Sequence, residues 1–401
     1  MANKLNNSLA GESRPRRLLL CLDGVPHKLI EAARHRGLFD AFGPPTRLLS
    51  PFPTMTNVAL SAMLGATPPA GYESLYFDRN ARELRGGIGK YLGRRTPDKV
   101  PSSYMDDLDY QEPLPFEFLI YVAPEKVWRA DMQRFRERFL TAPQTRDYFA
   151  FLKATDGLLH SQGPARLAIA LESLDKILSE IRESCGSETE IVMFSDHGMN
   201  LDENRRVPLK SSLERKGFKV TIPAFGLCSY AAVYCDSDVI PEAACASAEV
   251  PGVDFAVYKD GDAAVVESDR GQARIARRGD EFRYTAVSGD PLELGRLGGE
   301  FKSDFKTEKD WFEKTAGHRY PDAVANVYKS VFTPRVKHTA DVLLSIKDGF
   351  YYGWSPFGRF VRLYATHGNA MQASSNAFLM STHRHFPPFV RADDARTLLR
   401  S

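Results

Sequence analysis

The chain has 401 residues, of which 43% are hydrophobic and 26% charged, so a packed core is expected and intrinsic disorder is not. The 53 Lys and Arg residues against 51 Asp and Glu leave a net charge of +2, which argues against a nucleic-acid polymer as partner. No apolar run is long enough to span a bilayer or to form a signal core. The five cysteines include no Cys-x-x-Cys pair, so we expect free thiols and a cytoplasmic protein.

Short apolar runs alternate with amphipathic stretches along the chain. The runs that predict strands are 17–22, 46–50, 116–122, 190–194 and 360–364. The stretches that predict helices are 26–33, 57–64 and 166–181. Strands that alternate with helices favour an α/β fold with a doubly wound, mostly parallel sheet flanked by helices.

Two stretches depart from this alternation. Residues 78–115 are rich in Arg, Gly, Asp and Pro and predict a loop-rich insert. Residues 246–345 contain four short strand-like runs separated by Asp- and Gly-containing turns, which is typical of a β-meander. We therefore expect one domain over residues 1–401 with a small antiparallel insert at the edge of the main sheet.

Acidic and histidine residues stand just after predicted strands or at the starts of predicted helices. These residues are Asp23, Asp156, His160, Asp196, His197 and His367. Ligands of open α/β sheets bind at the carboxyl ends of strands, so these side chains could converge there. Carboxylates mixed with imidazoles suit zinc well and manganese less well. Each motif alone also fits a helix cap or a surface pair.

A threonine-containing segment, Pro53-Thr54-Met55-Thr56, follows the predicted strand at 46–50 and leads into a predicted helix. A hydroxyl at a helix N-terminus lies beside free backbone N–H groups, which suits a phosphate oxygen. A hydroxyl next to a metal ion is also acidified and becomes a usable nucleophile. The alternative is that Thr56 simply caps the helix.

The order of these motifs resembles the alkaline phosphatase superfamily, and the Pro-Thr-x-Thr segment is similar to that of its nucleotide pyrophosphatase/phosphodiesterase branch. The resemblance implies that the second threonine of the segment, Thr56, is the nucleophile. The ligands that it implies for one zinc ion are Asp156, His160 and His367. The ligands that it implies for a second ion are Asp23, Thr56, Asp196 and His197.

This resemblance implies a hydrolase that cleaves phosphodiester or pyrophosphate bonds of a small phosphorylated substrate through a phosphothreonine. Its cofactors would be two divalent ions, zinc or alternatively manganese. Asn57 and Asn80 are candidates for holding a phosphate oxygen, although such residues are more often structural. No Cys/Ser-x-Pro-x-Arg segment surrounds Thr56, which disfavours a sulfatase. A phosphomonoesterase, a phosphotransferase and a non-catalytic metal-binding protein stay open as alternatives.

Overall fold

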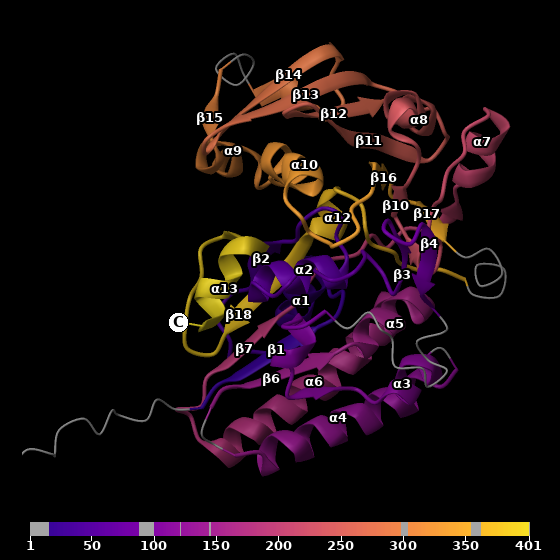
Figure 1. Cartoon of the computed structure of the whole chain (residues 1–401). Helices are drawn as coiled ribbons and strands as arrows, with labels where there is room; N and C mark the ends of the chain where they lie inside the picture. Colours follow the sequence, from indigo (N-terminus) through magenta and orange to yellow (C-terminus); the bar gives the residue numbers. More distant parts are fainter. Residues whose placement is uncertain are drawn as a thin grey trace, which may run out of the picture.

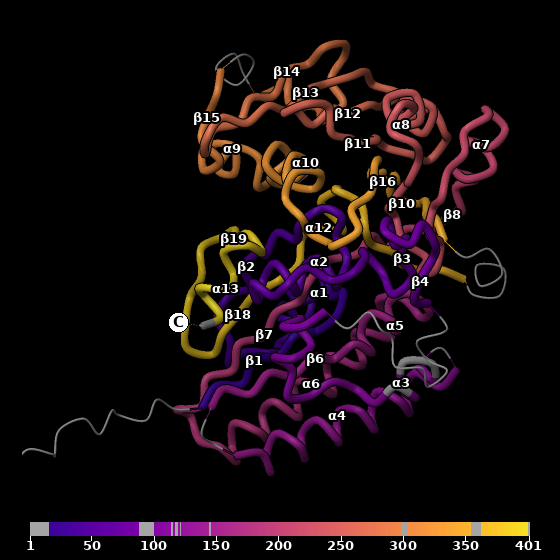
Figure 2. Tube along the Cα trace, viewed as in Figure 1, coloured from indigo at the N-terminus to yellow at the C-terminus, as the bar shows by residue number. Residues whose placement is uncertain are grey.

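The computed structural model describes residues 16–87, 100–120, 122–143, 146–297, 304–353 and 362–400. Figure 1 shows two units, an antiparallel sheet above and a helix-flanked central sheet below. The N-terminal and C-terminal segments lie side by side in the lower unit, where β18 pairs with both β2 and β7 (Figure 2). Within the described residues, no helix combines the length and apolar composition that crossing a bilayer requires.

The central sheet has seven strands in the order β19-β2-β18-β7-β1-β6-β5. Its strands are β1 (Leu18–Leu22), β2 (Thr46–Leu49), β5 (Tyr110–Gln111), β6 (Tyr148–Leu152), β7 (Ile191–Phe194), β18 (Asn376–Ser381) and β19 (Phe389–Arg391). β1 is parallel to both of its neighbours, whereas β18 is antiparallel to its own. All residues of β6 and β7 are buried, because helices cover both faces of the sheet.

The side chains of β1 alternate between these two faces. Leu18, Leu20 and Leu22 pack against one set of helices, and Cys21 packs against the other. The helices on the first face are α1 (His27–His35), α4 (Pro124–Thr141), α5 (Ala154–Gln162) and α6 (Pro164–Cys185). Those on the second face are α2 (Thr56–Leu64) and α13 (Ala392–Arg400).

The antiparallel sheet also has seven strands, in the order β10-β16-β11-β12-β13-β14-β15. They are β10 (Tyr230–Val233), β11 (Val253–Asp260), β12 (Ala263–Ser268), β13 (Gly271–Arg278), β14 (Glu281–Gly289), β15 (Lys306–Thr307) and β16 (Val342–Ile346). Two helices, α9 (Glu308–Thr315) and α10 (Ala323–Phe332), lie between this sheet and the central unit (Figure 1). The opposite face packs against α7 (Leu209–Arg215) and α8 (Ile240–Ala248).

Smaller elements connect the two units. The hairpin strands are β3 (Leu75–Asp78) and β4 (Glu83–Gly86), and a three-stranded sheet joins β8 (Arg205–Arg206), β17 (Phe350–Gly353) and β9 (Leu227–Cys228). Short helices occur at α3 (Leu114–Leu119) and α12 (Gln372–Ser375). The 3₁₀ turns are Tyr104–Asp107, Ser237–Val239 and Leu294–Leu297.

The structure confirms the predicted α/β class, with a mostly parallel, helix-flanked sheet, and also the β-meander, which is β11 to β14. The meander belongs to a sheet larger than the small insert we expected. That sheet recruits β10, which precedes the expected insert at 246–345, and β16, which crosses its end. Of the expected insert at 78–115, the described part consists of the β4 strand, short turns and β5.

Two strand predictions are wrong. Residues 116–119 belong to helix α3 instead, residues 120 and 122 lie in the turn after it, and residue 121 lies outside the described residues. A short apolar run cannot distinguish these outcomes by its periodicity. In the run at 360–364, residues 360 and 361 lie outside the described residues, and 362–364 form no strand.

Candidate active site

The predicted ligands come from four loops at one edge of the central sheet. Asp23 follows β1, and Asp196 and His197 follow β7. Asp156 lies in the first turn of α5, directly after β6. His367 lies before α12 in a loop that pairs with Asn200 through Thr366. Because β1, β6 and β7 are parallel neighbours, their carboxyl ends bring three of these loops together.

One group of ligands surrounds the carboxylate of Asp156. Its Oδ1 lies 3.1 Å from His160 Nε2 and 3.6 Å from His367 Nε2. The ring of His367 stacks on that of His197, with centroids 3.8 Å apart and an interplanar angle of 14°. Ligand atoms of Asp156, His197 and His367 all lie within 4.8 Å of one another, so together they could hold a metal ion.

A second group contains Asp23, Asp196 and His197, whose ligand atoms are also within 4.8 Å of one another. His197 Nε2 lies 3.6 Å from Asp23 Oδ1 and 3.4 Å from Asp196 Oδ2. The structure therefore brings the six predicted acidic and histidine ligands together. It differs from the pattern that the resemblance implies in one respect, since His197 borders both groups.

The three imidazoles share one mode of attachment. In each ring Nδ1 contacts a backbone carbonyl oxygen, which leaves Nε2 directed at the carboxylates. The carbonyl partners are Ala365 for His160 at 2.7 Å, Gly198 for His197 at 3.0 Å, and Thr54 for His367 at 2.8 Å. This arrangement fixes the tautomer that presents an unprotonated Nε2 to a metal ion.

The electrostatics of the site also suit a cation. Burial lowers the pKa of His197 to about 4 and that of His367 to about 3, so both rings are neutral ligands at pH 7. Burial raises the pKa of Asp196 to about 6, and burial together with Asp196 raises the pKa of Asp23. Asp196 Oδ2 is buried without a hydrogen-bond partner among the described residues. Carboxylates that are buried this close together are poorly compensated by the protein alone.

Two glycines allow the ligand loops to approach each other. Gly24 has a φ of +67°, and a Cβ there would lie 2.6 Å from Met199 Cε and 3.1 Å from Asp156 Oδ1. A Cβ on Gly198 would lie 2.4 Å from the carbonyl oxygen of Ala373. The glycine that follows Asp196-His197 is therefore required by close backbone packing.

Thr56 is the first residue of α2, and Met55 is the residue that caps this helix. The hydroxyl of Thr56 does not cap it. Instead, Oγ1 lies 3.3 Å from His197 Nε2 and 3.4 Å from Asp23 Oδ1. This placement removes the capping alternative and sets the hydroxyl beside the second ligand group.

The two candidate phosphate contacts have different surroundings. Asn57 is half-buried next to Thr56, where its Oδ1 accepts a 2.9 Å hydrogen bond from Tyr104 OH and its Nδ2 donates to Gly71 O. Asn80 is exposed in the turn between β3 and β4, where its backbone N–H donates to Asp78 Oδ1. The structure thus places Asn57, but not Asn80, beside the nucleophile candidate.

Sequence reasoning missed the role of Thr54, the first threonine of the Pro-Thr-x-Thr segment. Its Oγ1 accepts a 2.9 Å hydrogen bond from Gly368 N and donates a 3.0 Å bond to Asn369 O. Its backbone N–H donates to Gly368 O at 3.1 Å. These bonds join the Thr56 loop to the His367 loop. The sequence feature that could have indicated this role is the spacing of the Pro-Thr-x-Thr segment, which places Thr54 two residues before Thr56.

The family described as type I phosphodiesterase/nucleotide pyrophosphatase has a profile that matches residues 73–348. The matched range contains Asp156, His160, Asp196 and His197 and lies between Thr56 and His367. A comparison with curated protein sequences gave no match.

Solved structures with this fold include human ectonucleotide pyrophosphatase/phosphodiesterase 5, with a TM-score of 0.52 and 13% identity over 96% of this chain and 93% of that one. Phosphonoacetate hydrolase from Sinorhizobium meliloti, in complex with phosphonoformate, has a TM-score of 0.52 and 14% identity over 99% and 98%. An inactive threonine-to-alanine variant of murine ectonucleotide pyrophosphatase/phosphodiesterase 5, in complex with AMP, has a TM-score of 0.51 and 14% identity over 96% and 94%. The profile match over more than half of its residues shows that the chain belongs to the type I phosphodiesterase/nucleotide pyrophosphatase family of phosphoester hydrolases.

Proposed function

We propose that this protein is a two-metal hydrolase of phosphodiester or pyrophosphate bonds and that Thr56 is its nucleophile. The observation that carries the proposal is the position of Thr56 Oγ1, within 3.4 Å of both His197 Nε2 and Asp23 Oδ1. A threonine hydroxyl is a weak nucleophile unless a neighbouring group activates it. Its contact with two candidate metal ligands therefore supports the nucleophile role.

Two divalent ions would be held by the six buried or half-buried acidic and histidine side chains. We assign Asp156, His160 and His367 to one ion and Asp23, Asp196, His197 and Thr56 to the other. Three imidazoles with three carboxylates favour zinc over manganese. Ions bound there would acidify the Thr56 hydroxyl and neutralise charge on the phosphoryl oxygens.

The chain itself supplies the nucleophile and an anion-binding helix end. Thr56 Oγ1 forms a bond to phosphorus as the bond from phosphorus to the leaving oxygen breaks. Water then hydrolyses the phosphothreonine and restores the hydroxyl. The first turn of α2 contains no acidic residue, so its N-terminal N–H groups are favourable to a phosphate oxygen, and Asn57 is the adjacent side chain.

A small phosphorylated molecule of the nucleotide class is the substrate that we propose. Support comes from the family match and from the murine neighbour that binds AMP. We also propose a cytoplasmic location, for which the support is that all five cysteines are free thiols.

The nucleophile is tested by Thr56→Ala and Thr56→Ser. Thr56→Ala removes the attacking oxygen, so turnover of bis-p-nitrophenyl phosphate should fall by at least about 10³-fold while metal content and folding stay unchanged. Thr56→Ser retains a hydroxyl and should retain measurable turnover. With this diester, mass spectrometry of acid-quenched enzyme should detect a p-nitrophenyl phosphoryl group on residue 56, since only one nitrophenolate leaves in the first step. Substantial turnover by Thr56→Ala would overturn the assignment.

Bond preference is tested by comparing bis-p-nitrophenyl phosphate with p-nitrophenyl phosphate on metal-analysed protein. Faster diester cleavage is expected. Faster monoester cleavage would instead identify a phosphomonoesterase. Phosphorylated alcohols among the products, when an acceptor alcohol is added, would identify a phosphotransferase.

A further inference from the structure

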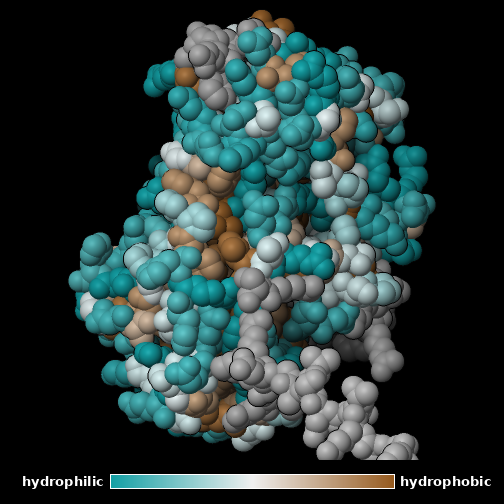
Figure 3. All heavy atoms as spheres, turned by 90° about the vertical axis from the view of Figure 1, so that its left-hand side faces the viewer, coloured by the Kyte–Doolittle hydropathy of each residue, from teal (hydrophilic) through white to brown (hydrophobic). Residues whose placement is uncertain are grey.

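The segment that carries Thr56, residues 50–56, is held between the two units of the molecule. Phe52, Met55 and Val58 belong to the hydrophobic core that lies under the antiparallel sheet rather than to the core of the central sheet. Phe52 packs against Phe255 of β11, with ring centroids 5.7 Å apart. Hydrophobic residues also gather on the surface in a strip at the level where the two units meet (Figure 3). The nucleophile loop therefore contacts the antiparallel unit.

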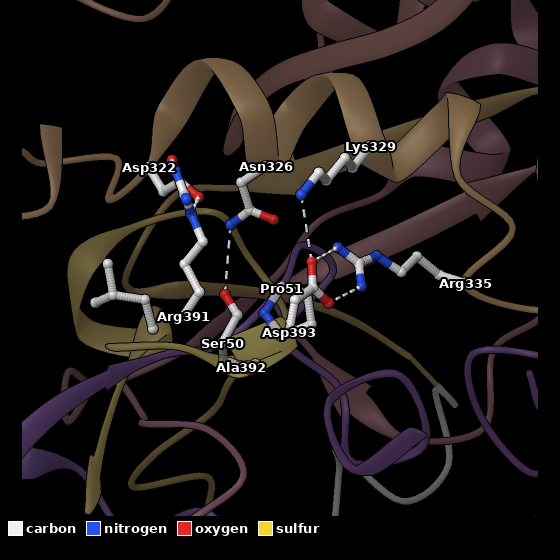
Figure 4. Close-up of a pocket in the computed structure, with 10 residues that line it drawn as sticks. Ser50, Pro51, Asp322, Asn326, Lys329, Arg335, Arg391, Ala392 and Asp393 are labelled. Atoms are coloured by element: carbon white, nitrogen blue, oxygen red, sulfur yellow. Dashed lines mark hydrogen bonds and ion pairs between the residues drawn. The ribbon is translucent and has the colours of Figure 1, made fainter. Parts of the chain in front are cut away.

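One polar side chain of that unit, Asn326 on α10, binds the backbone of the loop at two points. Its Oδ1 accepts a 2.7 Å hydrogen bond from Phe52 N, and its Nδ2 donates a 3.3 Å bond to Ser50 O. Figure 4 shows the Asn326 side chain directed at Ser50. Between these two residues lies Pro51, which has no N–H to offer. Asn326 is 8% exposed, so water does not readily replace these bonds.

The loop that Asn326 binds reaches the active site at Thr54. Thr54 is two residues beyond Phe52, where its carbonyl oxygen contacts His367 Nδ1 at 2.8 Å. Thr56 follows two residues later, with its Oγ1 against His197 Nε2. Asn326 thus anchors one end of a short backbone segment whose other residues contact a predicted metal ligand and carry the nucleophile.

Ion pairs beside Asn326 also attach α10 and the residues that follow it to the central unit. Arg335, just after α10, binds both oxygens of Asp393 at 2.7 and 3.2 Å, and Lys329 lies 3.4 Å from Asp393 Oδ2 (Figure 4). The cavity between these side chains has a volume of about 20 Å³, which is room for one water molecule and not for a substrate. These side chains form a joint around α10 that attaches the antiparallel unit to the central unit.

We propose that Asn326 is a positioning residue, which holds the 50–56 loop so that the Thr56 hydroxyl is aligned for attack on phosphorus. The inference rests on the proposed role of Thr56. Displacing a reacting atom by about 1 Å can lower the rate by roughly 10²-fold even when the mutated residue touches no substrate. The antiparallel unit would then contribute to catalysis through the backbone of the nucleophile loop.

The test is Asn326→Leu, which keeps the branching at Cγ and removes both hydrogen bonds, compared with Asn326→Asp, which keeps the size of the side chain and the acceptor for Phe52 N–H. With bis-p-nitrophenyl phosphate, kcat of Asn326→Leu should fall about 10- to 100-fold while KM changes less than about twofold. Asn326→Asp should recover part of that loss. Bound metal should stay at the wild-type stoichiometry in both variants.

Asp393→Asn is the matched control, because it weakens the ion pairs of the same joint and leaves both hydrogen bonds of Asn326 to the loop in place. It should lower the melting temperature and leave kcat unchanged. Equal kcat in Asn326→Leu and wild type, with Thr56→Ala inactive, would overturn this inference alone. Turnover by Thr56→Ala would overturn the proposed function instead. A kcat loss in Asn326→Leu that Asp393→Asn reproduces at equal destabilisation would also contradict the positioning role.

Discussion

Two clusters of charged groups lie on either side of the nucleophile loop, and they are built in opposite ways. At the joint around α10, each carboxylate has a cationic partner: Asp322 pairs with Arg391, and Asp393 pairs with Arg335 and Lys329. In the candidate active site, the carboxylates of Asp23 and Asp196 face imidazoles that burial keeps neutral.

The pKa values of Asp393 and Asp196 follow this difference. Partial burial acts to raise the pKa of Asp393, but Arg335 and Lys329 outweigh it and lower that pKa to about 2. Burial raises the pKa of Asp196 to about 6, and no Lys or Arg among the described residues pairs with it. Asp322 is the exception, since burial raises its pKa although it pairs with Arg391. Acids paired with cations indicate structural attachment, whereas buried acids without a cationic partner indicate a site that a bound cation would complete.

The largest effect should come from removing a predicted metal ligand in the candidate active site. His367→Ala removes the imidazole that stacks on His197 and faces Asp156, so metal content should fall. Turnover should fall by at least about 10²-fold, because metal ions contribute several kcal/mol to such reactions. Inductively coupled plasma mass spectrometry and the diester assay measure both quantities.

The control for this variant is His383→Ala. His383 is exposed, and among the described residues its ring has a hydrogen bond to the neighbouring Thr382. Its metal content and turnover should match those of the wild type. Unchanged metal stoichiometry in His367→Ala would count against its role as a ligand.

A smaller effect is expected at the joint around α10, where the acids pair with cations. Asp322 binds Arg391 through both oxygens, at 2.7 and 2.9 Å, and its side chain is 8% exposed. Asp322→Asn leaves the Arg391 charge with a weaker partner, so the free energy of unfolding should fall by about 3 kcal/mol. Urea denaturation measures this loss, and metal content should not change.

A surface pair provides the comparison for Asp322→Asn. Glu172 lies 3.5 Å from Arg36, and both side chains are about half exposed. Glu172→Gln should change the free energy of unfolding by less than about 1 kcal/mol. If Asp322→Asn removed metal without destabilising the fold, the distinction between the two clusters would be wrong.

The sequence predicted those parts of the molecule whose patterns are local. The buried runs of β1 and β7 and the turns of the β-meander each carry their own periodicity, and the order of the acidic and histidine motifs picked out side chains that the structure brings together. The assignment at 116–122 failed because a short apolar run fits a strand and a helix equally well, so its neighbours in the fold decide the outcome. The run Tyr148–Leu152, which is β6, was not predicted, although Asp156 lies in the first turn of the helix that follows it.

The sequence could not predict relations between distant segments. Asn326 is an ordinary polar residue in a helix until α10 lies against Ser50 and Phe52, more than 270 positions earlier in the chain. The shared position of His197 between the two ligand groups also depends on how the four loops meet. These relations follow from how the sheets and helices pack and not from any motif.

The smallest effect concerns Asp131 on α4, a buried acid whose partner is a hydroxyl rather than a cation. Tyr110 OH donates to Asp131 Oδ1, and Oδ2 has no partner among the described residues. Burial raises the pKa of Asp131 to about 6. The unfolded chain, whose Asp has the usual lower pKa, releases this proton first, so the stability of the native protein should fall as pH rises from about 4 to about 6.

Asp131→Asn cannot ionise and keeps an acceptor for Tyr110, so it should be more stable than the wild type at pH 7, by about 2 kcal/mol, and this advantage should disappear near pH 4. Urea denaturation of metal-free protein across this pH range measures the difference.

Asp393→Asn should behave oppositely, because Arg335 and Lys329 lower the pKa of Asp393. This variant should be less stable than the wild type at pH 7, and the difference should disappear only as pH falls below about 4. Parallel pH profiles for the two variants would mean that the cationic partners of Asp393 do not account for the different effects of these two acids on stability.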